Sequence, residues 1–107
     1  MYQVFSALGD PTRFGIVERL LAEGELNAGQ LLDGISVSGP AVSRHLKVLR
    51  NAGIVTQRVD AQRRVYAIAP DAIAAIHAWT MDHRTFWEGS IDRLAQALGE
   101  KDDRFGD

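Results

Sequence analysis

The chain has 107 residues, no cysteine and 46% hydrophobic residues. This length predicts one domain whose core is modest for its size, so a second copy of the chain is an expected source of stability. Without cysteine, disulfide and thiolate chemistry are excluded. No apolar run approaches the roughly 18 residues of a membrane span, and the first residues show no signal-peptide pattern. We therefore expect a cytoplasmic protein that does not enter membranes.

The formal net charge of −2 conceals an uneven distribution of charge along the chain. Residues 38–66 hold six basic residues and one acidic residue, so this segment carries +5. The other residues hold six basic and 13 acidic side chains, or −7. A domain need not be basic overall to bind a polyanion if its cations share one surface. The pattern indicates residues 38–66 as a candidate nucleic-acid interface.

Two helices are predicted before Gly24. Apolar residues at helical spacing predict a short helix over residues 2–8. Asp10 is placed to cap a second helix, in which Pro11 takes the first position and needs no N–H. This helix is expected to run to about Glu23 and to turn four apolar side chains inward: Phe14, Val17, Leu20 and Leu21.

A third short helix and a longer fourth helix follow. Asn27 can cap the third helix, which ends at Leu32. Ser38 can cap the fourth helix, predicted over residues 39–52, and Gly53 suits the left-handed residue that follows a helix. Two helices joined by a tight turn form a helix-turn-helix, whose second helix enters the major groove of DNA.

The helix over residues 39–52 has two faces of different chemistry. At about 100° per residue, one face gathers its apolar side chains. These are Val42, Leu46 and Leu49, with Ala41, Val48 and Ala52 at the margins. The opposite face carries Pro40, Ser43, Arg44, Lys47 and Asn51. One face can pack while the other contacts a polyanion.

After Gly53 the pattern changes from helix to strand. Residues 54–59 and 64–69 are rich in β-branched and aromatic residues, with residues 60–63 as the hairpin tip. The tip lacks the glycine that would identify the turn type. The hairpin is interpreted as a wing, and the predicted fold is a mostly α winged helix-turn-helix with the order α-α-α-α-β-β-α.

A last, long helix is predicted over residues 71–98. It carries a wide apolar stripe: Ile73, Ile76, Trp79, Phe86, Trp87, Ile91, Leu94 and Leu98. The stripe is too wide and too aromatic for a lone surface helix, so it requires a partner. Residues 1–98 are expected to form the single domain, and residues 99–107 a loose tail.

Three segments together resemble the ArsR/SmtB family of winged helix-turn-helix repressors. They are FSALGDPTR at residues 5–13, SGPAVSRHLKVLRNAGIV at residues 38–55 and QRRVY at residues 62–66. The resemblance covers about residues 2–70. It implies a homodimer, formed through the first and last helices, that binds double-stranded DNA at an inverted-repeat operator and blocks transcription.

The resemblance also maps the family's DNA-binding positions onto this chain. They fall on Ser38, Gly39, Pro40, Ser43, Arg44, His45 and Lys47, and on Arg63 and Arg64 in the wing. Many relatives carry glutamine where this chain has Gly39, which predicts an altered operator preference. Arg58 and Arg50 are weaker candidates.

The roles expected at these positions differ. Arg44 is expected to contact a base edge, and Lys47 a phosphate. His45 lies at the edge of the apolar arc, where packing and a phosphate hydrogen bond stay equally open. Two arginines at the wing tip suit the minor groove or its phosphates. Outside this surface, Arg13 and Arg19 are expected to form helix-surface pairs with nearby acids such as Asp10 and Glu23.

The expected dimer interface combines both ends of the chain. Its candidates are Val4, Phe5, Leu8, Ile76, Trp79, His83, Phe86, Trp87, Ile91 and Leu94. His83 lies inside the apolar stripe and has two interpretations. It is an interface residue that bonds a backbone carbonyl or its symmetry mate, or it contacts an acidic or cationic ligand in an aromatic effector pocket.

No metal cofactor is predicted. Metal-sensing members of the family use cysteines on the third helix, where this chain has Asn27 and Gly29, or paired Asp, His and Glu ligands on the last. His77 and His83 are six residues apart, about 240° around the axis, so they cannot chelate one ion from one chain. The last helix resembles the metal-free members, which include SdpR-like and START-domain-associated regulators.

Three alternatives remain beside the metal-free repressor. A metal site completed across the dimer, or an unidentified small-molecule effector bound at the last helix, would make the protein a responsive derepressor. A protein-interaction adaptor that kept the winged-helix fold is the alternative of another class. An enzyme is not expected, because the chain has no Gly-rich phosphate loop, no cysteine nucleophile and no Ser/His/acid set that the predicted fold brings together.

Overall fold

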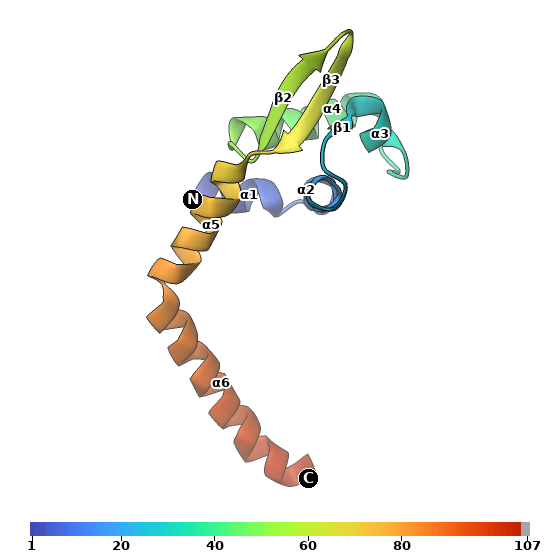
Figure 1. Cartoon of the computed structure of the whole chain (residues 1–107). Coiled ribbons are helices and arrows are strands. Elements are labelled where there is room, and N and C mark those ends of the chain that lie inside the picture. Colours follow the sequence, from blue (N-terminus) through green and yellow to red (C-terminus); the bar gives the residue numbers. More distant parts are fainter. Residues whose placement is uncertain (106–107) are drawn as a thin grey trace. The chain divides into compact units, whose positions relative to one another are not determined.

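The computed structural model describes residues 1–105, with side chains for residues 1–86 and 88–99. The chain divides into two compact units, Met1–Ile76 and a second unit that begins at His77. The first unit holds α1 (Tyr2–Leu8), α2 (Pro11–Glu23), β1 (Leu26–Asn27), α3 (Ala28–Leu32), α4 (Gly39–Asn51), β2 (Val55–Asp60), β3 (Arg63–Ile68) and the start of α5 (Pro70–Asp82) (Figure 1). No described helix is long and apolar enough to cross a membrane.

The helix starts are those that the capping residues predict. The Asp10 carboxylate accepts a hydrogen bond from the Arg13 backbone N–H at 3.1 Å, and the Ser38 hydroxyl accepts from Ala41 N–H at 3.3 Å. Asn27 forms a reciprocal capping box with Gln30, with bonds of 2.8 and 2.9 Å. These bonds satisfy N–H groups that have no partner inside the helix, and so they set where each helix begins.

The wing belongs to a three-stranded antiparallel sheet with the strand order β1-β3-β2. β2 and β3 pair from Val55 opposite Ile68 to Asp60 opposite Arg63. β1 pairs with β3 through only two residues, and the sequence prediction missed it. Two residues are too few to show the alternation that marks a strand.

The predicted order of elements, α-α-α-α-β-β-α, is corrected to α-α-β-α-α-β-β-α-α. The structure adds the strand β1 and divides the predicted last helix into α5 and α6 (Arg84–Phe105).

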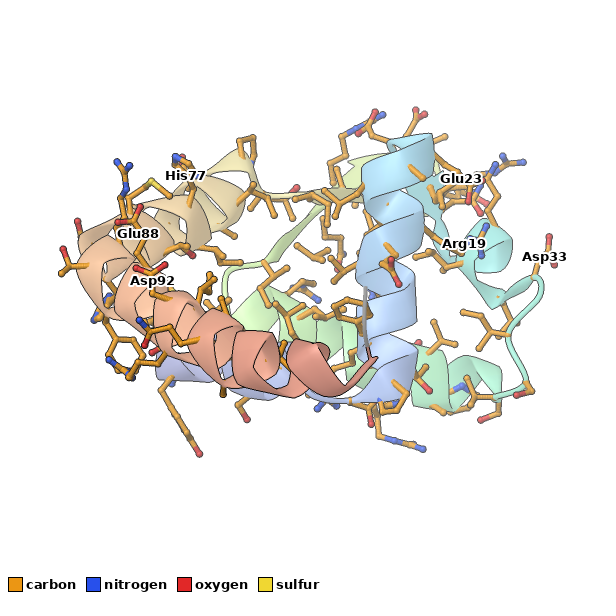
Figure 2. The ribbon with its side chains drawn as sticks, turned by 90° about the horizontal axis from the view of Figure 1, so that it is seen from below. Arg19, Glu23, Asp33, His77, Glu88 and Asp92 are labelled. Atoms are coloured by element: carbon orange, nitrogen blue, oxygen red, sulfur yellow. The ribbon has the colours of Figure 1, made fainter. Side chains whose placement is uncertain are left out.

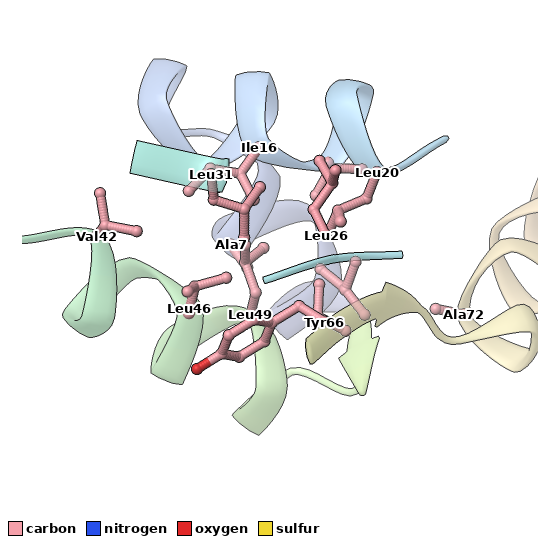
Figure 3. Close-up of a cluster of buried hydrophobic side chains, with 13 residues drawn as sticks. Ala7, Ile16, Leu20, Leu26, Leu31, Val42, Leu46, Leu49, Tyr66 and Ala72 are labelled. Carbon is pink, nitrogen blue, oxygen red and sulfur yellow. The ribbon is translucent and has the colours of Figure 1, made fainter. Parts of the chain in front are cut away.

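The core of the first unit is built from α2, α3, α4 and the sheet (Figure 3). Its fully buried large side chains are Ile16, Leu31, Leu46, Leu49 and Ile54. In α4 the predicted apolar face is confirmed, because Val42, Leu46 and Leu49 are all at most 2% exposed. Burial of this face fixes which side of α4 remains in solvent.

The buried face of α2 differs from the predicted one. Val17 and Leu20 are buried as expected, but Phe14 is 48% and Leu21 is 56% exposed, and the prediction omitted the buried Ile16. On the helical wheel Ile16, Val17 and Leu20 form one stripe. Phe14 and Leu21 lie about 100° from the centre of this stripe. The tertiary packing selects the narrower stripe.

In the second unit, the helix predicted over residues 71–98 is broken at His83. α5 ends at Asp82 and α6 (Arg84–Phe105) begins at Arg84. Both the backbone N–H of His83, at 3.2 Å, and its Nδ1–H, at 2.8 Å, donate to the carbonyl oxygen of Trp79. A side chain that bonds the carbonyl four residues back competes with the helical ladder and bends it. α6 then continues to Phe105, past Leu98, where the sequence predicted a loose tail.

Candidate nucleic-acid interface

α4 carries free cations on the face opposite its buried side. Arg44 and Lys47 are exposed, as are Ser38, Pro40 and Ser43, while Gly39 is half-buried. Within the described part of the chain, neither Arg44 nor Lys47 forms an ion pair or a side-chain hydrogen bond. An arginine or lysine without a protein partner is available to a phosphate or a base edge. The structure therefore presents these two cations as the helix prediction requires.

The wing tip adds two further free cations. Arg63 lies opposite Asp60 in the hairpin and Arg64 opposite Val59, and both arginines are exposed. Neither makes an ion pair among the described residues. Successive residues of a strand point to opposite faces, so the two guanidinium groups leave the hairpin on different sides. One hairpin tip can therefore contact a duplex from either of its faces.

A hollow of about 600 Å³ lies beside the wing tip. Its lining comes from the two ends of α3 and from the hairpin: Asn27, Ala28, Gly29, Gln30, Asp33, Gln62, Arg63 and Arg64. The tertiary fold thus brings the wing arginines to the start of the helix-turn-helix. The sequence alone places these segments more than thirty residues apart.

Arg58 is engaged within the protein. Its Nε and Nη2 donate to the Glu25 carboxylate at 2.7 and 3.0 Å, across from β2 to the segment before β1. The hydrogen bonds from Arg58 lower the pKa of Glu25, and the same bonds raise the pKa of Arg58. Both side chains are about half exposed, so the pair is screened by water. Contact of Arg58 with DNA stays a prediction, and the bonds to Glu25 already occupy its Nε and Nη2.

His45 lies on the packed side of α4 and contacts α2. Its side chain is 22% exposed, and its Nδ1 lies 3.2 Å from Nη1 of Arg13 and 3.9 Å from Oδ2 of Asp10. Arg13 also donates from Nε to the carbonyl oxygen of Ala7 at 2.7 Å. The guanidinium of Arg13 therefore bonds α1 and α4 rather than the carboxylate of Asp10, which corrects the predicted surface pair. The backbone N–H of Arg13 lowers the pKa of Asp10.

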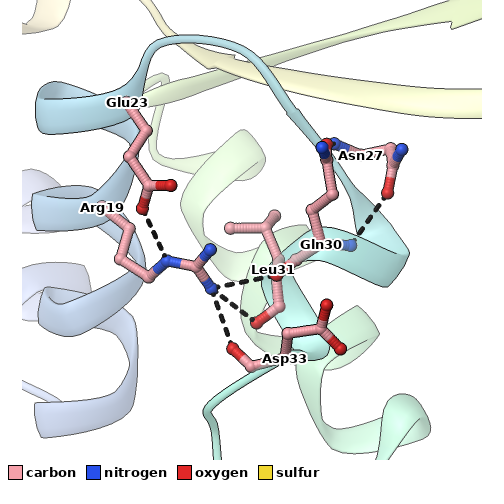
Figure 4. A network of polar contacts seen from close by, with 6 residues as sticks. All are labelled: Arg19, Glu23, Asn27, Gln30, Leu31 and Asp33. Atoms are coloured by element: carbon pink, nitrogen blue, oxygen red, sulfur yellow. Dashed lines mark hydrogen bonds and ion pairs between the residues drawn. The ribbon is translucent and has the colours of Figure 1, made fainter.

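Arg19 ties α2 to the end of α3 (Figure 4). Its Nε donates to Glu23 at 3.0 Å, as predicted, and its Nη1 donates to three carbonyl oxygens, of Gln30 at 3.0 Å, Leu31 at 3.3 Å and Asp33 at 3.1 Å. Figure 2 shows Arg19, Glu23 and Asp33 at the same end of the first unit. The last carbonyls of a helix lack helical partners, so the guanidinium stabilises the turn that leads into α4. Contacts 11 to 14 residues away leave no local sequence signal, and the sequence prediction missed them.

The predicted dimer residues are largely apolar and many are exposed. On α6, Phe86 is 59%, Ile91 62% and Leu94 59% exposed. On α1, Phe5 is 42% exposed, while Val4 and Leu8 are half-buried against the core. Ile76 and Trp79 are half-buried, and the side chain of Trp87 lies outside the described ones. Exposed apolar side chains such as those of α6 are typical of an interaction surface.

The last two helices carry histidine and acidic side chains of the kinds that a metal site uses. His77 lies on α5, and Glu88 and Asp92 on α6 (Figure 2). Among the described residues, no group of three His, Asp or Glu side chains is placed to hold a metal ion. The ring of His83 lies 4.4 Å from that of Trp79, and its Nδ1 bonds the Trp79 carbonyl oxygen. A bond to a backbone carbonyl is part of the first interpretation of His83, whose place in a dimer interface stays a prediction.

Comparison with known proteins agrees with this geometry. Residues 10–57 match the family described as "Bacterial regulatory protein, arsR family". The HTH-type transcriptional regulator Rv2034 of Mycobacterium tuberculosis is 42% identical over 101 residues, which cover 94% of this chain and 91% of the relative. The transcriptional repressor SdpR of Bacillus subtilis is 29% identical over 82 residues, which cover 77% and 90%.

A solved structure supports the same assignment. The crystal structure described as "Possible transcriptional regulator for arsenical resistance" matches with a TM-score of 0.73 and 33% identity, covering 91% of this chain and 96% of that chain. Its fold and the family match account together for the helix-turn-helix and the wing. The chain therefore belongs to the arsR family of bacterial regulatory proteins and has the fold of a winged helix-turn-helix transcriptional regulator.

Proposed function

We propose that the protein is a homodimeric repressor that binds an inverted-repeat DNA operator through α4 and the wing. The observation that carries this proposal is the pair of exposed cations on α4, Arg44 and Lys47, which have no partner among the described residues. The name of SdpR, a transcriptional repressor, supports repression rather than activation. Repression follows physically if the bound dimer occupies DNA that the transcription machinery needs.

The proposed dimer forms through α1 and the last two helices. Support comes from the exposed apolar side chains Phe5, Phe86, Ile91 and Leu94, whose burial would remove apolar area from water. In a two-fold dimer the two α4 helices enter successive major grooves about 34 Å apart. Arg63 and Arg64 of each wing then contact the flanking minor grooves or their phosphates.

We further propose that repression requires no metal ion and takes place in the cytoplasm. The donor chemistry supports the first point, since the chain has no cysteine and Nδ1 of His83 is already bonded. A chelator is then expected to leave DNA affinity unchanged, and added zinc or arsenite to leave the complex intact. Release of DNA by either ion would replace this proposal with the metal-responsive alternative.

The decisive experiment is selection of bound duplexes from a random DNA pool. We expect a palindromic consensus, because each protomer of a two-fold dimer contacts an equivalent half-site. If the dimer neutralises about 6 to 10 phosphates, its affinity for that duplex falls about 10³-fold or more between roughly 50 and 200 mM salt. Failure to enrich any sequence, or an affinity that does not depend on salt, would contradict the proposal.

A further inference from the structure

Arg13 lies at the junction of three helices. Its own helix is α2, its Nε donates to the carbonyl oxygen of Ala7 at the end of α1, and its Nη1 bonds Nδ1 of His45 in α4. Ala7 is 3% exposed, and the His45 side chain is 22% exposed. One guanidinium therefore connects the helix that carries part of the proposed dimer interface with the helix that carries Arg44 and Lys47.

The chemistry of the guanidinium determines the state of the imidazole. Arginine has N–H donors and no acceptor, so Nδ1 of His45 must accept this hydrogen bond. The neutral ring then carries its hydrogen on Nε2. The Asp10 carboxylate caps α2 by accepting from the Arg13 backbone N–H at 3.1 Å, and its Oδ2 lies 3.9 Å from Nδ1 of His45, beyond hydrogen-bond distance.

The helical position of His45 separates it from the DNA-facing side chains. At 100° per residue, His45 projects about 40° from the buried Leu49 and about 160° from the exposed Lys47. A side chain in this position faces the protein. Contact with α2, rather than with a phosphate, is what its surroundings support.

Val4, Ala7 and Leu8 of α1 pack against the core, but apolar packing does not close the whole space between α1 and α4. A hollow of about 240 Å³ lies there, lined by Tyr2, Gln3, Ser6 and Ala7 on α1 and by Val48, Asn51 and Ala52 at the end of α4. Interdigitated apolar side chains would hold two helices in one arrangement, and a hollow gives up part of that constraint. The hydrogen bonds from Arg13 to Ala7 and His45 are directional, so they constrain the position of α4 relative to α1.

We propose that Arg13 and His45 are positioning residues that hold the recognition helix α4 at a fixed position and angle relative to α1. In the dimer, this link sets the distance and angle between the two α4 helices, and so the half-site spacing that the protein accepts. The inference rests on the proposed function, since it requires a dimer that binds DNA through α4. His45 itself does not touch DNA.

Two substitutions at His45 separate the positioning role from a phosphate contact. In His45→Asn the side-chain oxygen lies near the place of Nδ1 and can accept from Arg13, but no donor remains near Nε2. In His45→Gln the amide lies near the place of Nε2, and the acceptor for Arg13 is lost. The probes are the selected inverted-repeat duplex, the same duplex with one base pair inserted between its half-sites, and a single half-site.

His45→Asn is expected to keep wild-type affinity for the full duplex. His45→Gln is expected to lose about tenfold, the scale of one charge-assisted hydrogen bond, and to discriminate less against the inserted base pair. Its affinity for the single half-site should stay within about twofold. Arg13→Lys, whose single ammonium cannot reproduce the planar fork, should behave like His45→Gln, and the two changes combined should not add.

The opposite pattern would overturn the inference. If His45→Asn weakens both the full duplex and the half-site while His45→Gln binds normally, His45 is a phosphate ligand. If all variants bind like the wild type, the link has no role in DNA binding. Nitrogen NMR of the wild type gives an independent readout that does not depend on variant folding, and a hydrogen on Nδ1 of His45 would refute the bonding scheme. A wild type that selects no inverted repeat would refute the proposed function instead.

Discussion

Cationic side chains of α2, α4 and the wing fall into two groups according to their contacts. Arg13, Arg19 and Arg58 bond backbone carbonyls, an imidazole or a carboxylate of the protein itself. Arg44 and Arg63 have no such partner among the described residues, and neither do Lys47 and Arg64. The first group stabilises the arrangement of the helices and the sheet, and the second is left for a polyanion.

Arg44→Ala and Lys47→Ala are expected to have different effects on DNA binding. Loss of a base contact at Arg44 should cost about 1–3 kcal/mol on the preferred duplex and relax its sequence preference. Loss of a phosphate contact at Lys47 should weaken all duplexes by a similar factor and lower the salt slope by about 1. Titrations with the selected and a scrambled duplex measure both effects.

Arg93→Ala is the matched control for these two variants. It removes one positive charge from α6, where Arg93 bonds only Ser90 among the described residues, and should bind DNA like the wild type. If Arg44→Ala and Lys47→Ala also bind and repress normally, the DNA-contacting face of α4 has been assigned wrongly.

The free energy of unfolding is expected to fall in acid, partly through Glu25. The pKa of Glu25 in the folded protein is lowered from its ordinary 4.5 by hydrogen bonds from Arg58. The unfolded state then binds a proton first, so the stabilisation is present above pH 4.5 and is lost as the pH falls through the lowered pKa. Asp10 acts in the same direction from its ordinary 3.8.

Denaturant unfolding of the wild type and of Glu25→Gln tests this effect. The variant cannot ionise at this position, so its stability should decline less steeply below pH 4.5 than that of the wild type. Parallel declines of the two proteins would show that the Glu25–Arg58 pair does not contribute to the acid dependence.

At the scale of elements, the wing loop contains a residue in an unfavourable conformation. Ala61 has φ of +59°, and Gln62 completes a two-residue loop between Asp60 and Arg63. A positive φ at the first loop position alone is the pattern of a type II′ turn, which favours glycine there. We expect Ala61→Gly to stabilise the protein by about 0.5–1 kcal/mol, because relief of the left-handed strain exceeds the added freedom of the unfolded chain.

Thermal denaturation measures this change, with Gln62→Gly as its control. Gln62 has no positive φ, so glycine there relieves no strain and adds only freedom to the unfolded chain. Gln62→Gly should therefore be neutral or destabilising. Equal effects of the two glycines would show that the backbone of Ala61 costs little.

The end of α5 shows a second element-scale feature without a glycine or proline. The sequence from Trp79 to Trp87 contains no helix breaker, and yet α5 ends at Asp82 and α6 starts at Arg84. At this break the His83 side chain bonds the Trp79 carbonyl oxygen, and such a bond competes with the helical ladder. An ion pair between Arg84 and Glu88 at 2.8 Å supports the first turn of the new helix.

At the scale of the whole molecule, the exposed apolar face of α6 leads to a prediction about assembly. Leu94→Asp places a charge where apolar side chains are 59–62% exposed in the single chain, so it should yield monomers if this face forms the dimer. Light scattering of the purified protein measures the mass. Gln96→Asp adds the same charge to an exposed position about 160° around the helix and should leave the dimer intact. A dimeric Leu94→Asp would place the interface elsewhere.

The division of charge acts over the whole chain as well. The segment over residues 38–66 carries +5 and the remainder −7. Within the first unit this segment forms α4, its turn and the wing, so the cations are concentrated on the elements that we propose contact DNA. The acidic remainder discourages binding of DNA to other surfaces.

The sequence predicted the helix starts and the buried face of α4 because short-range chemistry decides them. A cap such as Asp10, Asn27 or Ser38 acts within three residues, and the stripe of Val42, Leu46 and Leu49 follows helical spacing alone. The hairpin was also predicted, because its two strands are neighbours in the sequence and pair across a short loop. The free cations of α4 followed from the same periodicity, since a buried face defines its opposite.

Long-range contacts decided what the sequence could not. β1 exists because Leu26 and Asn27 pair with Tyr66 and Val65, some forty residues later in the chain. The carbonyl contacts of Arg19 and the bonds of Arg13 to Ala7 and His45 likewise join segments that no periodic pattern relates. Local propensity and spacing determine which face of a helix is apolar, whereas packing in three dimensions determines which polar groups meet and which remain free.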